Sequence, residues 1–393
     1  MPLQQPLTLI ENANLYDPEP VGTKSLLIGG GKILAISDTR MQFPPELAVD
    51  SVDFAGKTVI PGFIDCHSHI TGGGGEAGFS TRVPPVPLSK FTSAGVTTVV
   101  GLLGTDDTAR TTGELVSTVY ALREQGLSAF CWTGGYHLPL TTLTGSARSD
   151  IVFIEPVIGI GEFAISDHRS SQPQFDEIIR LASEAHVAGL MTGKAGIIHF
   201  HLGDGDRKLA LIERAIAETE IPPRVFHPTH VNRNKPLFQH ACNLLSSGCY
   251  IDLTAFPKNA VEPGISAAQA LVDIIELGLP LEQVTVSSDG GGCMPFFSEQ
   301  GELTHMDFGD PNTLSQTLKD AIESGLDLEQ ILPVFTRNVA KLLRMENKGQ
   351  ISVGCDADLL AIDHHFSITD VMAMGQWHRY DNKRVKKGFF EQE

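Results

Sequence analysis

The hydrophobic positions of this chain follow two different patterns, one at the two ends and one in the middle. Near the start, the apolar runs 25–28 and 33–36 flank the turn 29–32, which predicts a β-hairpin. The end of the chain repeats this pattern, with apolar runs in 350–354 and 357–363 and a basic strand region around 384–386. We therefore expect a small β-sandwich domain that is built from both termini, residues 1–57 and 347–393.

The middle of the chain, residues 58–346, alternates short apolar runs with longer helix-like stretches. This α/β pattern is typical of a parallel (β/α)8 barrel of the TIM type. A doubly wound open sheet is the alternative, but no GxGxxG motif stands at the first strand–helix turn. The expected strands are 59–65, 96–103, 128–132, 157–165, 197–202, 225–231, 249–254 and 284–288, and the expected helices are 108–124, 175–186, 207–218, 236–246, 266–276, 314–323 and 328–345.

Polar side chains that can bind metal ions stand at the ends of several expected strands. The reactive groups of a parallel barrel gather at the carboxyl ends of its strands. His67 and His69 are two residues apart on one strand, so both face the same side. Imidazole and carboxylate together favour zinc or a similar divalent metal, and this set suffices for two ions around a shared hydroxide. The candidate ligands are His67, His69, Glu162, His201, His230 and Asp289.

Composition and charge narrow the range of partners and of cellular compartments. The 393 residues include 29 basic and 47 acidic side chains, which gives a formal net charge of −18. Such an acidic chain has no electrostatic reason to bind nucleic acid or an anionic membrane. The first residues lack a signal-peptide pattern, no apolar run reaches the roughly 20 residues of a membrane span, and the six cysteines are scattered. We therefore expect a cytoplasmic protein with reduced thiols.

Several sequence strings resemble a known family. The string 60–65 followed by His67-Ser68-His69 is similar to the opening motif of the amidohydrolase superfamily. Within it, nearly the whole chain resembles the isoaspartyl (β-aspartyl) dipeptidases, through the strings 72–76, 101–105, 133–137, 164–170, 200–204, 228–234 and 287–290. The resemblance implies a metal-dependent dipeptidase that hydrolyses the isopeptide bond of β-aspartyl dipeptides. It also implies two divalent ions, most simply Zn²⁺, and a homo-oligomer of up to eight subunits.

The resemblance also assigns roles to individual residues. His67 and His69 would bind the more buried ion and His201 and His230 the other. Asp289 would bind the first ion and act as general base and acid toward a metal-bridged hydroxide. Tyr136 would polarise the scissile carbonyl, Glu76 would take the α-ammonium of the substrate, and Arg169 and Arg233 would take its α-carboxylate. The full expected substrate-binding set is Gly74, Glu76, Thr105, Tyr136, Arg169, Arg233 and Cys293.

Two residues depart from the family pattern. Glu162 stands where the family usually has a lysine carboxylated on its ε-nitrogen, so the bridging carboxylate would be encoded directly. The glutamate side chain is shorter, and Gly159 and Gly161 would permit a bulge or a close approach there. Cys293 stands where serine is usual, and a thiol donates a weaker hydrogen bond than a hydroxyl.

Other interpretations remain open at this point. Glu162 could instead form a salt bridge or be solvated, leaving one metal ion. The chain could be another amide hydrolase of the superfamily, such as an N-acyl amino acid deacylase or a dihydroorotase-like enzyme, or a barrel that binds ligands without catalysis. His199 lies two residues before His201, and we expect it to be structural.

Overall fold

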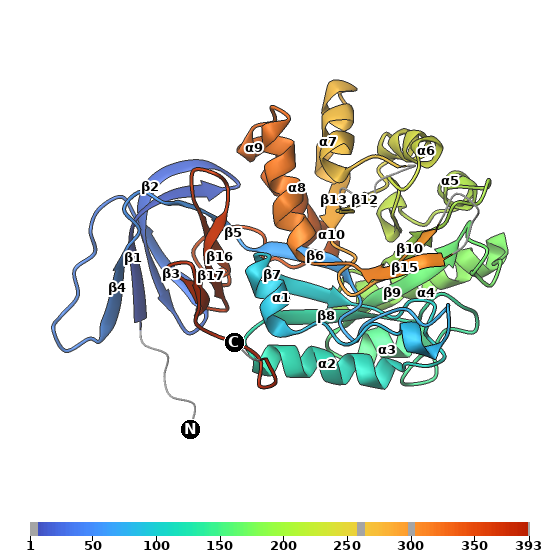
Figure 1. The fold of residues 1–393 in the computed structure, drawn as a ribbon, viewed down its shortest axis with the longest axis horizontal. Coiled ribbons are helices and arrows are strands. Elements are labelled where there is room, and N and C mark those ends of the chain that lie inside the picture. Colours follow the sequence, from blue (N-terminus) through green and yellow to red (C-terminus); the bar gives the residue numbers. More distant parts are fainter. Residues whose placement is uncertain (1–6, 258–263, 298–302, 392–393) are drawn as a thin grey trace.

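The computed structural model describes residues 7–257, 264–297 and 303–391. The first six residues, on which the expectation of no signal peptide depends, lie outside these ranges. Strands from both ends of the chain form one nine-stranded sheet with the order β19-β18-β17-β16-β5-β1-β2-β3, in which β4 also pairs with β1 (Figure 1). Its strands are Leu7–Asp17 (β1), Glu19–Gly29 (β2), Lys32–Ser37 (β3), Val49–Asp53 (β4), Thr58–Pro61 (β5), Leu359–Ile362 (β16), Ile368–Ala373 (β17), Gln376–Tyr380 (β18) and Lys383–Arg384 (β19).

The expected hairpin joins β2 to β3 in this sheet. Gly30 and Gly31 form its turn with φ of 59° and 79°, a backbone conformation that side chains with a Cβ rarely adopt. Ile10, Leu26 and Met372 belong to one buried apolar cluster, so residues from the start and the end of the chain share a hydrophobic core.

The middle of the chain forms a second, parallel sheet with the order β11-β10-β9-β8-β7-β6. This order follows the chain without the reversal that a doubly wound sheet contains. A further parallel pair continues it, because β12 lies beside β11 and β13 contacts β6. The sheet is therefore curled, as in a TIM-type barrel. The strands are Phe63–Ser68 (β6), Val96–Gly101 (β7), Ser128–Thr133 (β8), Val157–Ile165 (β9), Ile198–Leu202 (β10), Phe226–Thr229 (β11), Ile251–Thr254 (β12) and Val284–Ser287 (β13).

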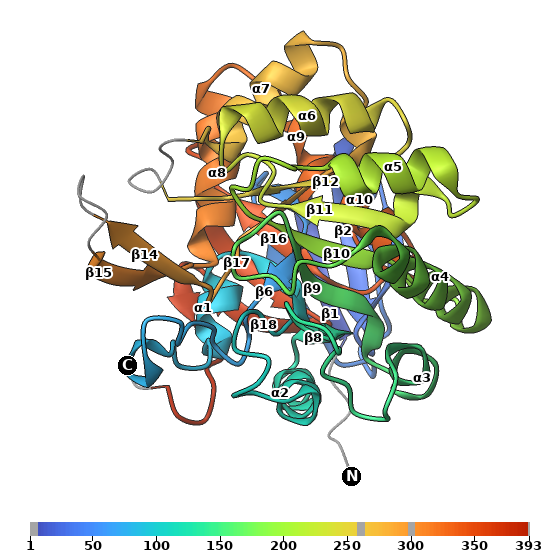
Figure 2. The same cartoon turned by 90° about the vertical axis from the view of Figure 1, so that its right-hand side faces the viewer.

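Helices surround the curled sheet (Figure 2). Several begin at a side chain that accepts a hydrogen bond from the first turn, namely Thr111 before α2, Asn234 before α6 and Ser266 before α7. The helices are Leu88–Ser93 (α1), Thr112–Glu124 (α2), Ala147–Phe153 (α3), Phe175–Thr192 (α4), Ala210–Glu218 (α5), Lys235–Leu245 (α6), Ala267–Glu276 (α7), Asn312–Glu323 (α8), Leu328–Phe335 (α9) and Arg337–Leu343 (α10), with 3-10 turns at Phe79–Thr81, Pro223–Val225 and Leu281–Gln283.

The structure differs from the expected elements in a few places. The single strand expected over 59–65 is divided at Gly62 into β5 and β6, which belong to different sheets. Gly62 is required there, because a Cβ would lie 2.1 Å from Thr97 Oγ1. The helix expected over 328–345 is divided at Thr336. The short helices α1 and α3 and the hairpin of β14 (Cys293–Phe297) and β15 (Leu303–Phe308) were not expected.

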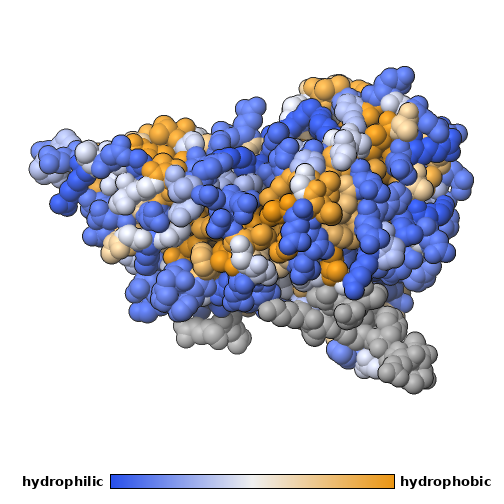
Figure 3. Space-filling model, turned by 90° about the horizontal axis from the view of Figure 1, so that it is seen from above, coloured by the Kyte–Doolittle hydropathy of each residue, from blue (hydrophilic) through white to orange (hydrophobic). Residues whose placement is uncertain are grey.

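Seen from above, hydrophobic residues form a band across the middle of the surface and also reach its upper edge, whereas the left and right ends are mostly polar (Figure 3). No helix among the described residues has both the length and the apolar character needed to cross a membrane.

Candidate metal centre

The carboxyl ends of the parallel strands bring together all six side chains that the sequence suggested as metal ligands. β6 carries His67 and ends immediately before His69, β9 carries Glu162, and β10 carries His201. His230 directly follows β11, and Asp289 lies two residues beyond β13. Donor atoms of five of the six form two overlapping groups, each within 4.8 Å: His67, Glu162 and His230, and His67, His69 and Asp289.

Glu162 lies between the two pairs of histidines. Its Oε1 is 2.5 Å from His201 Nδ1 and 3.2 Å from His230 Nε2. Its Oε2 is 3.7 Å from His67 Nε2 and 3.6 Å from His69 Nε2. Each carboxylate oxygen therefore faces one pair of imidazoles, which is the arrangement that a bridging carboxylate requires.

A local irregularity in β9 places Glu162 in this position. Ile160 pairs with Ile198 and Phe163 with Phe200, so Gly161 and Glu162 together lie opposite the single residue His199. A Cβ on Gly161 would be 2.9 Å from the Cβ of His199, so only glycine allows the two strands to approach this closely. The bulge that the glycines were expected to permit is therefore present, and it carries the shorter side chain inward.

Asp289 completes the second of these groups, with His67 and His69. Its Oδ1 is 3.3 Å from Nε2 of both His67 and His69. Asp289 and His230 both have left-handed backbone conformations, with φ of 52° and 59°, which are uncommon for residues other than glycine and are concentrated at functional sites. A Cβ on the nearby Gly292 would be 2.2 Å from Asp289 Oδ1, so glycine leaves room for the carboxylate.

The electrostatic field of this cluster favours a bound cation. Burial opposes charge on His67, yet the carboxylates of Glu162 and Asp289 raise its pKa to about 9. Burial would raise the pKa of Glu162, but the fields of His67 and His201 hold it well below its ordinary value. The described residues offer no hydrogen-bond partner to His67 Nε2, Glu162 Oε2 or Asp289 Oδ1, although all three atoms are buried. Unpartnered imidazole and carboxylate donors that face one another fit a divalent transition metal.

Tyr136 lies beside His201, in the loop that follows β8. Its hydroxyl is 2.7 Å from His201 Nδ1. Burial raises the pKa of this phenol well above its ordinary value, so it is a hydrogen-bond donor at neutral pH. The second nitrogen of the His201 ring contacts Asp167, because Asp167 Oδ2 is 2.9 Å from His201 Nε2. The sequence suggested no role for Asp167. The string 164–170 contains Asp167, but a spacing pattern gave no sign that it contacts His201.

The charged residues expected to bind substrate line the same region. Arg169 Nη1 is 3.2 Å from Glu76 Oε1, and its Nη2 is 2.8 Å from Asp167 Oδ2. Arg233 Nη1 is 3.5 Å from His201 Nε2 and donates to the carbonyl of Leu202 at 2.6 Å. Glu76 and Arg169 therefore pair with each other, and Arg169 Nη2 is also 3.4 Å from His201 Nε2 in the donor cluster.

The remaining expected residues lie around this region. A Cβ on Gly74 would be 3.4 Å from Cys293 Sγ, so these two residues are neighbours. Burial, with the negative charges of Glu76 and Asp289, raises the pKa of the Cys293 thiol to about 12. Thr105 follows Gly104, where a Cβ would be 2.7 Å from the ring of His69. Gly74 and Cys293 are thus neighbours of each other, and the residue before Thr105 lies beside His69.

The sequence did not predict which residues hydrogen-bond to the ring nitrogens of His67 and His230 that face away from Glu162. Thr254 Oγ1 is 2.7 Å from His230 Nδ1. His199, expected to be structural, has its Nε2 2.7 Å from His67 Nδ1. The spacing of His199 and His201 placed both on one strand face, but no pattern in the sequence related His199 to His67, which is 132 residues away.

Two known proteins are similar to this chain over most of its length. A crystal structure of a beta-aspartyl dipeptidase from Fervidobacterium islandicum AW-1, in complex with a beta-Asp-Leu dipeptide, is 38% identical, covers 98% of this chain and 99% of its own, and has a TM-score of 0.90. Among curated proteins, an allantoinase from Deinococcus radiodurans is 23% identical over 95% of this chain and 90% of its own length.

A further curated protein matches a smaller part of the chain. An imidazolonepropionase from Salinispora arenicola is 29% identical over 42% of this chain, and the match spans only 41% of that protein. Residues 58–378 match the amidohydrolase family as a whole. That match includes the curled sheet, the helices around it and all six candidate ligands. This chain belongs to the amidohydrolase family.

Proposed function

We propose that this protein is a metal-dependent dipeptidase that hydrolyses the isopeptide bond of β-aspartyl dipeptides. The observation that carries the proposal is the position of Glu162, whose two oxygens face His201 and His230 on one side and His67 and His69 on the other. The full-length likeness to a beta-aspartyl dipeptidase that binds beta-Asp-Leu supports the choice of substrate.

The donor cluster is proposed to hold two divalent ions, with zinc the best match to its chemistry. His67, His69 and Asp289 would hold one ion, His201 and His230 the other, and Glu162 would contact both. Such ions supply a Lewis acid and lower the pKa of a bound water toward about 7.

Two side chains are proposed to manage protons and charge during hydrolysis. Asp289 takes the proton of the attacking water and delivers it to the departing amine nitrogen. Its position at the edge of the donor cluster, 3.3 Å from both His67 and His69, supports this role. Tyr136 donates its hydroxyl hydrogen to the oxygen of the scissile carbonyl, where negative charge develops.

Substrate choice would follow from the charged residues around the cluster. The Glu76 carboxylate suits the α-ammonium of an isoaspartyl residue, and the planar guanidinium groups of Arg169 and Arg233 suit its α-carboxylate. The Glu76–Arg169 pair would open as the substrate provides a partner for each charge. Gly74, Thr105 and Cys293 would contact the substrate beside this clamp.

The finer architecture is also a proposal. We propose that β6 to β13 close into a complete (β/α)8 barrel, which is supported by the parallel bridge between Ser68 and Gly290 beside the β13–β6 contact. The terminal strands would form a β-sandwich domain of residues 1–57 and 347–393, with the barrel at 58–346. The terminal strands have an apolar cluster of their own around Ile10, Leu26 and Met372, which supports this division, and Leu360 and Val371 pack into the cluster of the curled sheet.

The assembly and the compartment are proposed in the same way. All six cysteines are unpaired, which supports a reducing compartment such as the cytoplasm. Exposed Phe153 on α3 and Leu190 and Met191 on the adjacent α4 offer apolar surface for a symmetric homo-oligomer of up to eight subunits. Light scattering coupled to size-exclusion chromatography measures the subunit number.

A panel of dipeptides with metal quantification tests the main proposal. Purified protein should contain about two zinc ions per chain and cleave β-Asp-Leu, but not its α-linked isomer, whose scissile carbonyl lies elsewhere relative to the clamp. Cleavage of N-acyl amino acids or cyclic amides in preference to β-Asp-Leu would favour another hydrolase of the family. Less than one ion per chain with no hydrolysis of any member would favour a non-catalytic barrel.

A further inference from the structure

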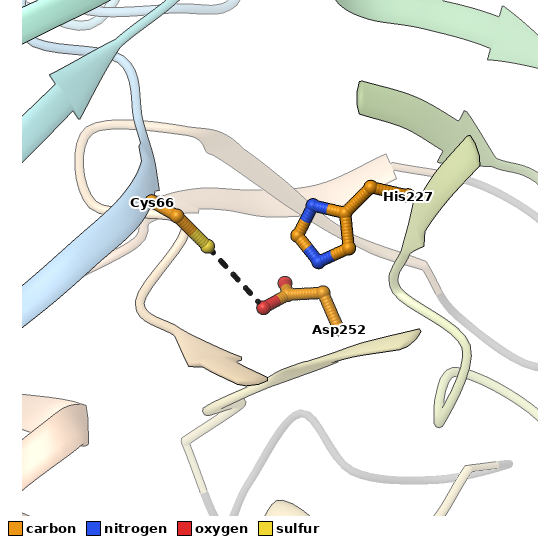
Figure 4. Close-up of side chains that lie close together, drawn as sticks. All are labelled: Cys66, His227 and Asp252. Atoms are coloured by element: carbon orange, nitrogen blue, oxygen red, sulfur yellow. Dashed lines mark hydrogen bonds between the residues drawn. The ribbon is translucent and has the colours of Figure 1, made fainter. Parts of the chain in front are cut away.

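A buried polar cluster lies deeper in the barrel than the candidate metal centre, around Asp252 of β12. Figure 4 shows Cys66 from β6 directed at Asp252, with His227 from β11 beside them. Both carboxylate oxygens accept hydrogen bonds: Oδ1 from Thr285 Oγ1 at 2.5 Å and Cys66 Sγ at 3.4 Å, and Oδ2 from Ser287 Oγ at 2.5 Å and Thr229 Oγ1 at 2.6 Å. Asp252 is fully buried.

A line of hydrogen bonds joins this cluster to the metal centre. Thr285 Oγ1 is 3.0 Å from His227 Nε2, and His227 Nδ1 is 2.9 Å from His199 Nδ1. His199 Nε2 is in turn 2.7 Å from Nδ1 of His67. All three imidazoles are fully buried, so no water competes for these bonds.

The position of each proton along this line follows from the chemistry of Thr285. A hydroxyl has one hydrogen, and Thr285 gives it to Asp252, so it can only accept from His227. His227 therefore carries its proton on Nε2 and accepts at Nδ1. His199 must then carry its proton on Nδ1 and accept at Nε2, and His67 must donate from its Nδ1.

The environment keeps the two intermediate rings neutral, as this sequence of donors and acceptors requires. Burial lowers the pKa of His227 to about 4. His199 is fully buried, and the partner of each of its ring nitrogens is another imidazole, so no acidic side chain among the described residues is hydrogen-bonded to it to balance a second proton. A neutral imidazole has one donor and one acceptor nitrogen, so a ring that donates from one nitrogen must accept at the other. All the hydrogen bonds along the line therefore point the same way, from His67 toward Thr285.

We propose that Asp252 and Thr285 are positioning residues that act through His227 and His199 to keep the proton of His67 on Nδ1, which leaves the Nε2 lone pair free to bind a metal ion. The geometry agrees with a free lone pair on His67 Nε2, because this atom faces Glu162 and Asp289 and has no hydrogen-bond partner among the described residues. Partners behind a ligating histidine set its tautomer in this way. The inference rests on the proposed metal centre.

The same cluster has the geometry of a metal site of its own, since Cys66, His227 and Asp252 present donor atoms within 4.8 Å. The atoms that would bind a metal ion already form hydrogen bonds, however: both oxygens of Asp252 and both ring nitrogens of His227 have hydrogen-bond partners. Burial and the Asp252 charge raise the pKa of the Cys66 thiol well above its ordinary value, which opposes the thiolate that a metal needs. The cluster therefore serves as the fixed end of the hydrogen-bond line.

Removing the Thr285 hydroxyl tests the proposal through zinc affinity, measured by competition with a chromogenic chelator. Thr285→Val keeps the shape of the side chain but leaves His227 Nε2 without an acceptor. We expect zinc affinity to fall roughly 10–100-fold, the usual effect of removing a partner behind a metal ligand. Thr285→Ser should restore it. Thr98→Val is the matched control, because Thr98 is another buried strand threonine and its hydroxyl has no hydrogen-bond partner among the described residues.

Nitrogen-15 NMR of histidine-labelled protein reads the tautomers directly, with signals assigned from His199→Asn and His227→Asn. The unmodified chain should carry the proton of His227 on Nε2 and that of His199 on Nδ1, a result that stands even if Thr285→Val does not fold. A His227 protonated on Nδ1, or equal zinc affinity in Thr285→Val, would overturn this inference alone. Failure of the unmodified chain to bind zinc would overturn the proposed metal centre and the inference with it.

Discussion

Gly161 and His199 lie closer together than any side chain at position 161 would allow, since an added Cβ would be 2.9 Å from the His199 Cβ and 3.1 Å from its carbonyl oxygen. Gly161→Ala should therefore push β9 away from β10 and move Glu162 out of the centre. We expect kcat to fall at least tenfold and the free energy of unfolding to fall by about 1–3 kcal/mol, as is usual for overpacking.

Gly113→Ala serves as the control for this substitution. Gly113 lies in α2, where an added Cβ would make only ordinary contacts, at 3.6 Å from Leu143. Alanine should increase stability there, by about 0.5–1 kcal/mol, and leave activity unchanged. Unchanged metal content and kcat in Gly161→Ala would mean that the close approach of the two strands does not position Glu162.

The carboxylate at position 162 can be replaced by a lysine that must acquire CO₂. Glu162→Lys should be inactive after removal of dissolved CO₂ and should recover activity with added bicarbonate, because carboxylation of the lysine restores a negative group. Glu162→Ala is the control, since bicarbonate cannot rescue it. Activity and zinc content are measured together, and full activity in Glu162→Ala would show that no bridging carboxylate is needed.

Loss of the Tyr136 hydroxyl should affect the chemical step. Tyr136→Phe keeps the ring beside His201 but removes the donor, so kcat on β-Asp-Leu should fall about 10²–10³-fold, equivalent to about 2.7–4 kcal/mol of transition-state stabilisation, while KM changes little. Tyr120→Phe, on the exposed face of α2, should change neither constant. A rise in KM alone would assign Tyr136 to substrate binding.

Arg233 should distinguish substrates that have the α-carboxylate from those that lack it. Arg233→Met removes one guanidinium, so kcat/KM for β-Asp-Leu should fall at least 100-fold, as expected for losing a charge-assisted hydrogen bond of about 3 kcal/mol. β-Ala-Leu, which is the same dipeptide without that carboxylate, should be cleaved equally by the variant and the parent. An equal loss on both substrates would indicate that Arg233 acts on the metal centre through His201.

His378 should make the fold less stable in mild acid. Burial, helped by the nearby Lys386 charge, lowers the pKa of His378 to about 4, whereas the unfolded chain has the ordinary value of about 6.5. Below pH 6.5 the unfolded state therefore binds a proton at His378 that the folded state does not bind. The free energy of unfolding falls as the pH decreases, until the pH reaches about 4. Between pH 8 and pH 5 this single group costs about 2 kcal/mol.

Urea unfolding at several pH values measures this effect. His378→Leu should lose that part of the pH dependence, so the difference in unfolding free energy between the variant and the parent should change by about 2 kcal/mol between pH 8 and pH 5. His365→Asn is the control, because this side chain is exposed to water. A parallel pH dependence in His378→Leu and the parent would contradict the prediction.

Local patterns were enough to predict most of the strands and helices that form the site. The strand 157–165 has the expected bounds, and α7 differs from the expected 266–276 by one residue. The predicted bounds are wrong where contact with a residue distant in the sequence determines where a strand or helix ends. Gly62 divides a continuous apolar run into two strands because Thr97, from the next strand, leaves no room for a side chain. No local pattern contains that information.

The order of residues along the chain was enough to identify the side chains at the ends of the strands, because alternating strands and helices place the carboxyl ends of parallel strands at one edge. It therefore supplied His67, His69, Glu162, His201, His230 and Asp289 as one group. The three-dimensional fold was needed to see which oxygen of Glu162 faces which histidine, that Asp167 contacts His201, and that His199 connects His67 to His227 and so to the Asp252 cluster. These relations join residues far apart in the chain, and hydrogen bonds depend on distance and direction in space, which spacing along a sequence does not specify.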